Sequence, residues 1–116
     1  MQEPLNICFG AVEPSLALET KIKEKVSKLE RFCADIISCN VTLDKPHRHS
    51  HKGEIYSVHL VIHVPGREIA INRSPDECQE HEDVYVAIRD AFEKAERLLR
   101  EYVQLRRGQV KSHAQP

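Results

Sequence analysis

The feature that most constrains the fold is an alternating run in the middle of the chain. Between residues 56 and 64, the apolar side chains of Tyr56, Val58, Leu60, Ile62 and Val64 alternate with mostly polar ones. Successive side chains of a β-strand point to opposite faces of its sheet, so the run predicts a strand with one apolar face. Such a strand needs a covering layer on that face only.

Three shorter segments show the same alternation, at residues 5–9, 37–43 and 67–72. The pair Pro65–Gly66 predicts a turn, so the third and fourth strands form a hairpin. Two polar loops separate the remaining elements, at residues 45–53 and 73–81. The sequence thus predicts four strands, each with one buried face.

Two amphipathic helices are predicted to cover the apolar face of this sheet. The first spans residues 16–32 after the N-cap Ser15, and its apolar stripe comprises Leu18, Ile22, Val26, Leu29 and Cys33. The second begins near Glu82 or Asp83 and ends at Gly108. Its stripe consists of Val84, Ile88, Ala91, Phe92, Ala95, Leu99 and Tyr102.

The order β-α-β-β-β-α predicts an α+β fold, a two-layer sandwich with two helices on one face of the sheet. The first two strands are joined through a helix and should be parallel neighbours, which makes the sheet mixed. Residues 1–104 form one domain, and residues 105–116 form a polar, flexible C-terminal tail.

Bulk composition narrows the function. The 116 residues carry a net charge of −1, which argues against a generally basic nucleic-acid binder but allows positive charge gathered on one face. No apolar run approaches the roughly 20 residues of a membrane span, and the N-terminus lacks the features of a signal peptide. We therefore expect a cytoplasmic protein without a membrane partner.

The first helix carries its charges asymmetrically. Relative to Ile22, steps of 100° place Lys25, Lys21 and Lys28 at roughly 60°, 100° and 120° to one side of the apolar stripe, and the acids Glu19 and Glu30 on the other. A solvated charged surface explains such a pattern, and so does a basic flank that binds phosphate.

The second helix gives a weaker signal. Arg89 and Arg100 share one azimuth, but nearby glutamates dilute the charge. Lys94 lies on the opposite flank and Arg97 on the outer surface. If the helices pack side by side, one basic flank from each could line a shared groove and contact RNA phosphates.

Three local motifs occur in order on this strand and helix pattern: Lys25-x-x-Lys28-Leu29-Glu30, Asp83-x-Tyr85-x-Ala87-Ile88 and Lys94-x-x-Arg97-x-Leu99. With the topology, they make the chain resemble the ribosome hibernation promoting factor family over roughly residues 4–103. This family includes ribosome-associated inhibitor A, and its members are also labelled sigma-54 modulation proteins. The chain resembles a short form, without the dimerisation domain of long members.

The resemblance implies a double-stranded-RNA-binding-like sandwich. It also implies a translation inhibitor of stationary phase and stress that binds small-subunit ribosomal RNA near the decoding centre and blocks the messenger and transfer RNA sites. Lys25, Lys28, Lys94 and Arg97 match motif positions and would bind RNA. The azimuth argument alone adds Lys21, Arg89 and Arg100.

Other chemistry has little support. Seven histidines include His47, His49 and His51 in the 45–53 loop, which suits either a solvated loop or an RNA contact better than a metal site. The four cysteines are expected to be reduced packing thiols. No motif supports catalysis, so we predict no enzyme activity, cofactor, metal or small-molecule substrate.

The alternative function is a protein-interaction module that regulates a sigma factor or signalling enzyme.

Overall fold

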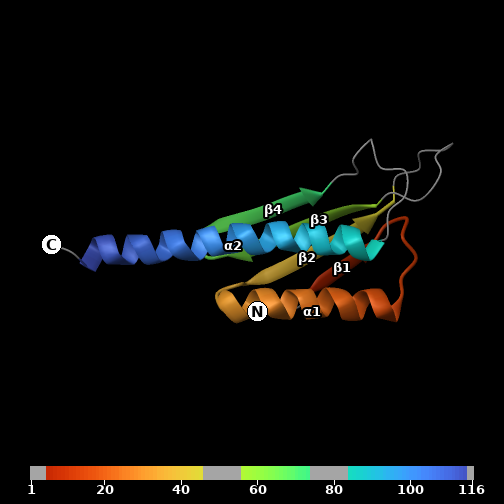
Figure 1. Cartoon of the computed structure of the whole chain (residues 1–116), viewed down its shortest axis with the longest axis horizontal. Helices are drawn as coiled ribbons and strands as arrows, with labels where there is room; N and C mark the ends of the chain where they lie inside the picture. Colours follow the sequence, from red (N-terminus) through yellow and green to blue (C-terminus); the bar gives the residue numbers. More distant parts are fainter. Residues whose placement is uncertain (1–4, 46–55, 74–83, 115–116) are drawn as a thin grey trace.

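A computed structural model describes residues 5–45, 56–73 and 84–114 (Figure 1). Its elements follow the predicted order and are β1 (Asn6–Phe9), α1 (Leu16–Phe32), β2 (Ser38–Asp44), β3 (Ser57–Val64), β4 (Arg67–Arg73) and α2 (Val84–Ala114). The strands form one sheet in the order β1-β2-β3-β4. Strand β1 pairs parallel to β2, and the other pairs are antiparallel, so the predicted mixed sheet is confirmed.

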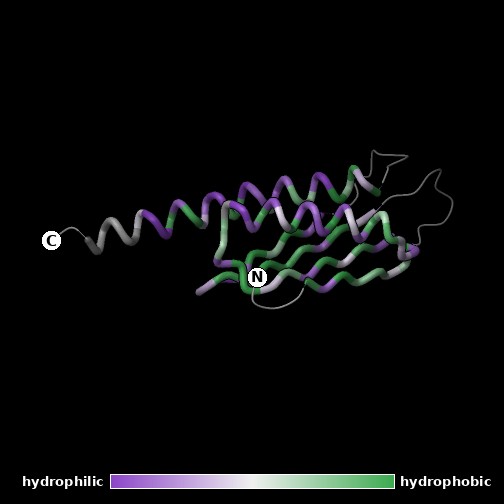
Figure 2. The backbone as a smooth tube through the Cα atoms, turned by 90° about the horizontal axis from the view of Figure 1, so that it is seen from below, coloured by the Kyte–Doolittle hydropathy of each residue, from purple (hydrophilic) through white to green (hydrophobic). Residues whose placement is uncertain are grey.

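Both helices lie on the same face of this sheet, as the view in Figure 2 shows. The core lies between the two layers, because the apolar faces of the strands and the helix stripes exclude water from each other. At its centre Leu60 of β3 is paired with Val41 of β2 and Ile71 of β4, and Ile22 and Ile88 of the helices are completely buried. The predicted two-layer α+β sandwich is therefore confirmed.

The ends of α1 form as its sequence predicts. The hydroxyl of Ser15 accepts a hydrogen bond of 3.1 Å from the backbone N–H of Leu18, which satisfies one of the donors left free at a helix start. At the other end the N–H of Cys33 donates to the carbonyl of Leu29. In the β3–β4 turn, Gly66 has φ +79°, a conformation that glycine adopts without a steric penalty.

The C-terminal helix is longer than predicted. Helix α2 continues through Gly108 to Ala114 and projects beyond the end of the sheet (Figure 1), so the predicted stop at Gly108 is wrong. Gly108 is not among the glycines with positive φ, which a glycine C-cap requires. One glycine costs a helix only about 1 kcal/mol, and good helix formers such as Arg106, Arg107 and Gln109 surround it.

Tyr102 fixes α2 where it leaves the sheet. Its hydroxyl donates to the carbonyl of Pro65 at 2.8 Å and accepts from Nη1 of Arg106 at 3.0 Å. The same Nη1 reaches Asp35, after α1, at 2.9 Å, and the guanidiniums of Arg67 and Arg106 lie over the tyrosine ring. Arg106 interrupts the apolar stripe because at this point α2 has passed the end of the core.

Two further predictions need correction. Arg73, assigned to a polar loop, is the buried last residue of β4. Cys33 and Cys39 are buried thiols, and burial raises the pKa of Cys39 to about 12, but Cys8 is exposed on β1 and is not a packing residue. The histidine loop from residue 46 and the predicted start of α2 at residues 82 and 83 lie outside the described residues.

Replacing Ile22 by Ala should lower the free energy of unfolding by about 2 to 5 kcal/mol, because it leaves a cavity in a completely buried site. Leu16, the exposed first residue of the same helix, is the control, and Leu16→Ala should change stability by less than about 0.5 kcal/mol. Urea denaturation measures both. Equal effects would contradict the proposed position of the core.

Candidate nucleic-acid interface

An ion pair between the helices shows which flank of α1 faces α2. Nζ of Lys28 lies 3.4 Å from Oε1 of Glu96. Lys21 and Lys25 share the flank of Lys28, seven and three residues before it, so all three belong to the side of α1 next to α2.

The same ion pair shows which side of α2 faces α1. Glu96 stands seven residues after Arg89 and four before Arg100, spacings that place all three on one side of a helix. The basic flanks of the two helices therefore meet, as the side-by-side prediction required. We call the resulting set the interhelical cationic surface, which consists of Lys21, Lys25, Lys28, Arg89 and Arg100.

The structure does not bring the other two predicted residues into this surface. Lys94 and Arg97 are exposed on α2, but steps of 100° turn Lys94 by roughly 200° and Arg97 by roughly 100° from Glu96. Lys94 therefore points away from α1, and Arg97 points outward, away from the sheet. The seven predicted cations thus divide into a set of five at the interhelical surface and a pair elsewhere on α2.

The cations of the surface differ in their partners. Lys21 lies 3.7 Å from Glu24 of its own helix, and Arg89 lies 3.3 Å from Asp90. Lys25 is half-buried, and among residues 5–45, 56–73 and 84–114 it has no ion pair. An added anion would therefore not have to compete with a described carboxylate for the ammonium of Lys25.

Glu96 contacts cations of both helices at this surface. Its Oε2 accepts hydrogen bonds from Nε and Nη2 of Arg100 at 3.2 and 2.9 Å, while Oε1 faces Lys28. The hydrogen bonds of Arg100, opposed by some desolvation and supported by the charge of Lys28, hold the pKa of Glu96 below its usual range. Glu96 is therefore ionised at neutral pH.

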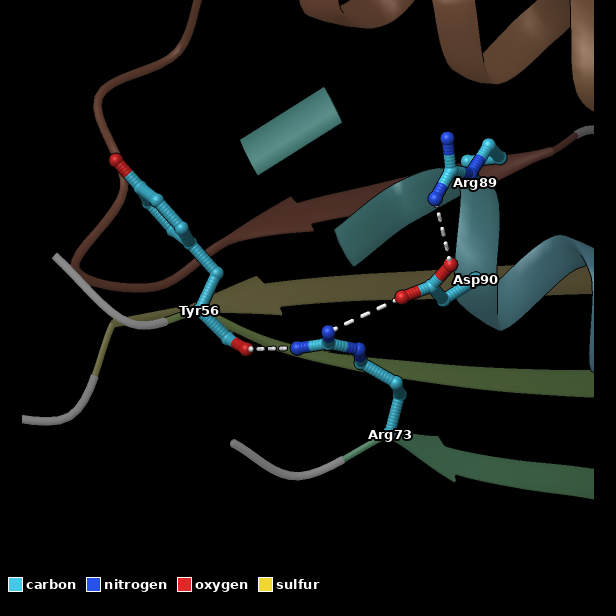
Figure 3. Close-up of polar contacts among 4 residues, drawn as sticks. All are labelled: Tyr56, Arg73, Arg89 and Asp90. Carbon is cyan, nitrogen blue, oxygen red and sulfur yellow. Dashed lines mark hydrogen bonds and ion pairs between the residues drawn. The ribbon is translucent and has the colours of Figure 1, made fainter. Parts of the chain in front are cut away.

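A buried arginine ties α2 to the sheet beside Arg89 (Figure 3). Nη1 of Arg73 donates to the carbonyl of Tyr56 at 3.2 Å, and its Nη2 lies 3.2 Å from Oδ2 of Asp90. Oδ1 of the same carboxylate accepts from Arg89 at 3.3 Å. Asp90 thus links a guanidinium in the protein interior to one at the interhelical cationic surface.

Sequence reasoning missed Glu96 and the Arg73–Asp90 pair. Glu96 looked like a diluting charge, because only the packing of α1 against α2 places Lys28 beside it. Arg73 looked like part of a polar loop, and the sole signal was its place directly after the alternation of β4. No local pattern in the sequence connects residues 73 and 90.

No metal site is assembled in the part of the chain that the structure describes. There, no three histidine, cysteine or acidic side chains are grouped so that they could hold a metal ion. His59 and His63 of β3 fall on the face of the sheet that the helices leave uncovered. Among the same residues, no helix combines the length and the apolar character needed to cross a membrane.

With this geometry in place, comparison with known proteins assigns the family. The model of the sigma 54 modulation protein / S30EA ribosomal protein family matches residues 5–107. The chain belongs to this family. The resemblance to hibernation factors predicted from three motifs is thereby confirmed, and membership in the S30EA family makes the chain a ribosome-associated protein. A comparison with curated proteins gave no match.

Solved structures support the fold of this S30EA family member. A ribosomal subunit interface protein from Coxiella burnetii aligns with a TM-score of 0.66 at 19% identity, covering 86% of this chain and 97% of that one. The N-terminal domain of Protein Y from Thermus thermophilus aligns with a TM-score of 0.65 at 17% identity, covering 88% and 99%. At these identities the likeness shows a shared fold.

Asp90→Asn should lower the free energy of unfolding by about 1 to 3 kcal/mol, because a largely buried guanidinium loses its charged hydrogen bond. The side chains of Arg73 and Asp90 are 9% and 34% exposed. Asp35 provides the control, since it pairs with Arg106 at 2.9 Å in an exposed position, and Asp35→Asn should cost less than about 1 kcal/mol. Thermal denaturation compares the two, and a larger loss for Asp35→Asn would contradict the anchoring role of Asp90.

Proposed function

We propose that this protein is a hibernation factor that binds ribosomal RNA of the small subunit near the decoding centre and blocks the messenger and transfer RNA sites in dormancy. The observation that carries the proposal is the interhelical cationic surface. Five cations from two helices converge on it in a chain whose net charge is −1. Membership in the S30EA family supports the ribosome as the partner.

Charge concentrated on one face suits a site on a structured RNA. Each lysine or arginine that contacts a phosphate releases a condensed counterion, so affinity rises with the number of contacts and falls with salt. The net charge of the whole chain is near zero, which limits its attraction to unrelated nucleic acid that contacts scattered positions. The surface therefore favours a partner that presents several phosphates at once.

The proposed action is steric. Bound protein would exclude messenger and transfer RNA by occupying their sites, and no step requires a bond to be made or broken. We accordingly propose that the protein acts in the cytoplasm, where ribosomes work, and that it is not an enzyme.

Replacing both Lys25 and Lys28 by Glu should weaken ribosome binding by at least about tenfold at low salt, because two phosphate contacts become repulsive. Sedimentation of the purified protein with ribosomes through sucrose measures the change. The control reverses the same number of charges on the same helix, at the exposed Lys23 and Arg31, which lie away from α2.

Three outcomes decide between the interpretations. Loss of binding in Lys25→Glu/Lys28→Glu with retention in Lys23→Glu/Arg31→Glu supports the interhelical site. Equal loss in both would show that only the total charge matters. Wild-type protein that fails to sediment with ribosomes at low salt would refute the proposed function itself.

A second double variant tests how far the contact extends. Lys94→Ala/Arg97→Ala removes the two predicted cations that lie outside the interhelical cationic surface. If RNA contacts the outer side of α2 as well, this variant should lose affinity about tenfold and show a shallower salt dependence in the same assay. Unchanged binding would confine the contact to the interhelical cationic surface.

The family description also names sigma 54 modulation, which keeps the alternative of a protein-interaction module that regulates a sigma factor or signalling enzyme. Capture of partners from lysate with and without RNase separates the two functions. A protein partner that survives RNase treatment, together with loss of ribosomal proteins in both samples, would favour the alternative.

A further inference from the structure

The carboxylate of Glu96 occupies the place where an anion would be expected to bind. One oxygen faces the ammonium of Lys28 at 3.4 Å, and the other accepts two hydrogen bonds from the guanidinium of Arg100. Its side chain is 23% exposed, against 60% and 63% for the two cations. The two cations thus stand in water while the carboxylate between them is partly covered.

This arrangement resembles the way a phosphate is held. Phosphates bind to arginine through two parallel N–H donors and to lysine as a point charge. Glu96 already receives both kinds of contact within the folded protein. A phosphate that approached Lys28 and Arg100 would meet a negative charge and would have to compete for the same donors.

We propose that Glu96 is a specificity-determining residue, an internal anion that RNA phosphates must displace from Lys28 and Arg100. The inference rests on the proposed binding of ribosomal RNA at this surface. It assigns to Glu96 the suppression of weak binding to unrelated RNA.

Selectivity follows if partners depend to different extents on the two cations that Glu96 holds. A partner with phosphates placed to reach Lys21, Lys25 and Arg89 binds mainly through cations that Glu96 does not contact, so the competition costs it little. A strand without that arrangement depends more on Lys28 and Arg100 and loses more affinity. An element that weakens the wrong partner more than the right one raises the ratio of affinities, even though it lowers both.

A purely structural role would give a different result. An i,i+4 pair such as Glu96–Arg100 adds little to helix stability, and Lys28 adds a link to α1. If Glu96 only held the cations in position, its removal would disorder them and weaken RNA binding. If Glu96 instead competes with RNA for these cations, its removal should strengthen RNA binding.

The test compares Glu96→Gln with Glu93→Gln. Both remove one negative charge from the same turn of α2, but Glu93 is exposed and has no ion pair among the residues that the structure describes. The probes are a short single-stranded RNA without secondary structure and purified ribosomes, each titrated over a series of salt concentrations.

We expect Glu96→Gln to bind the single-stranded RNA about tenfold more tightly at low salt, with a salt dependence steeper by about one counterion, and to gain less towards ribosomes. Glu93→Gln should change both affinities little. Glu96→Ala, which removes the side chain, should shift RNA affinity in the same direction. Weaker or unchanged RNA binding by both Glu96 variants, or an equal gain in Glu93→Gln, would overturn the inference.

The two proposals fail separately. Wild-type protein that does not bind ribosomes refutes the hibernation function, whatever the Glu96 variants do with single-stranded RNA. Wild-type protein that binds ribosomes, with an equal gain for RNA and ribosomes in Glu96→Gln, removes the selectivity role and leaves the function standing.

Discussion

The side-by-side packing of α1 and α2 on one face of the sheet is the constraint on which the rest of the structure depends. Each helix has an apolar stripe centred on a completely buried residue, Ile22 in α1 and Ile88 in α2. Each stripe is removed from water by packing against the sheet. Once both stripes face the strands, the rotation of each helix is set. Their flanks then meet between them, and the charges on those flanks become one surface.

That surface brings like charges together, which a protein of net charge −1 could have avoided. Packing brings Lys28 of α1 and Arg100 of α2 to either side of Glu96, and the hydrogen bonds of Arg100, with the charge of Lys28, hold the pKa of its carboxyl below the usual range. A charge arrangement that needs an internal anion when the protein is alone is suited to accept an external one. The electrostatics and the proposed RNA site are therefore two aspects of one arrangement.

The sequence predicted features that depend on neighbouring residues, and it missed features that depend on contacts between residues far apart in the chain. The alternation of residues 56–64 and the cap at Ser15 are local, and β3 and the start of α1 formed as predicted. Gly108 was misread, because a local stop signal yields where the neighbouring residues favour the helix. Arg73 was misread because its buried partner Asp90 is brought to it only by the docking of α2 on β4.

The sequence by itself determined the order of the elements, the buried side of each and the basic flank that carries Lys25 and Lys28, because periodicity relates residues within one helix or strand. Its local motifs also indicated the S30EA family. Only the tertiary structure decided that this flank faces α2, that Lys94 and Arg97 of α2 lie outside the interhelical cationic surface, and that Glu96 lies within it. The reason is physical: a charge acts on whatever lies within a few ångströms, and packing alone places residues 28 and 96 at that distance.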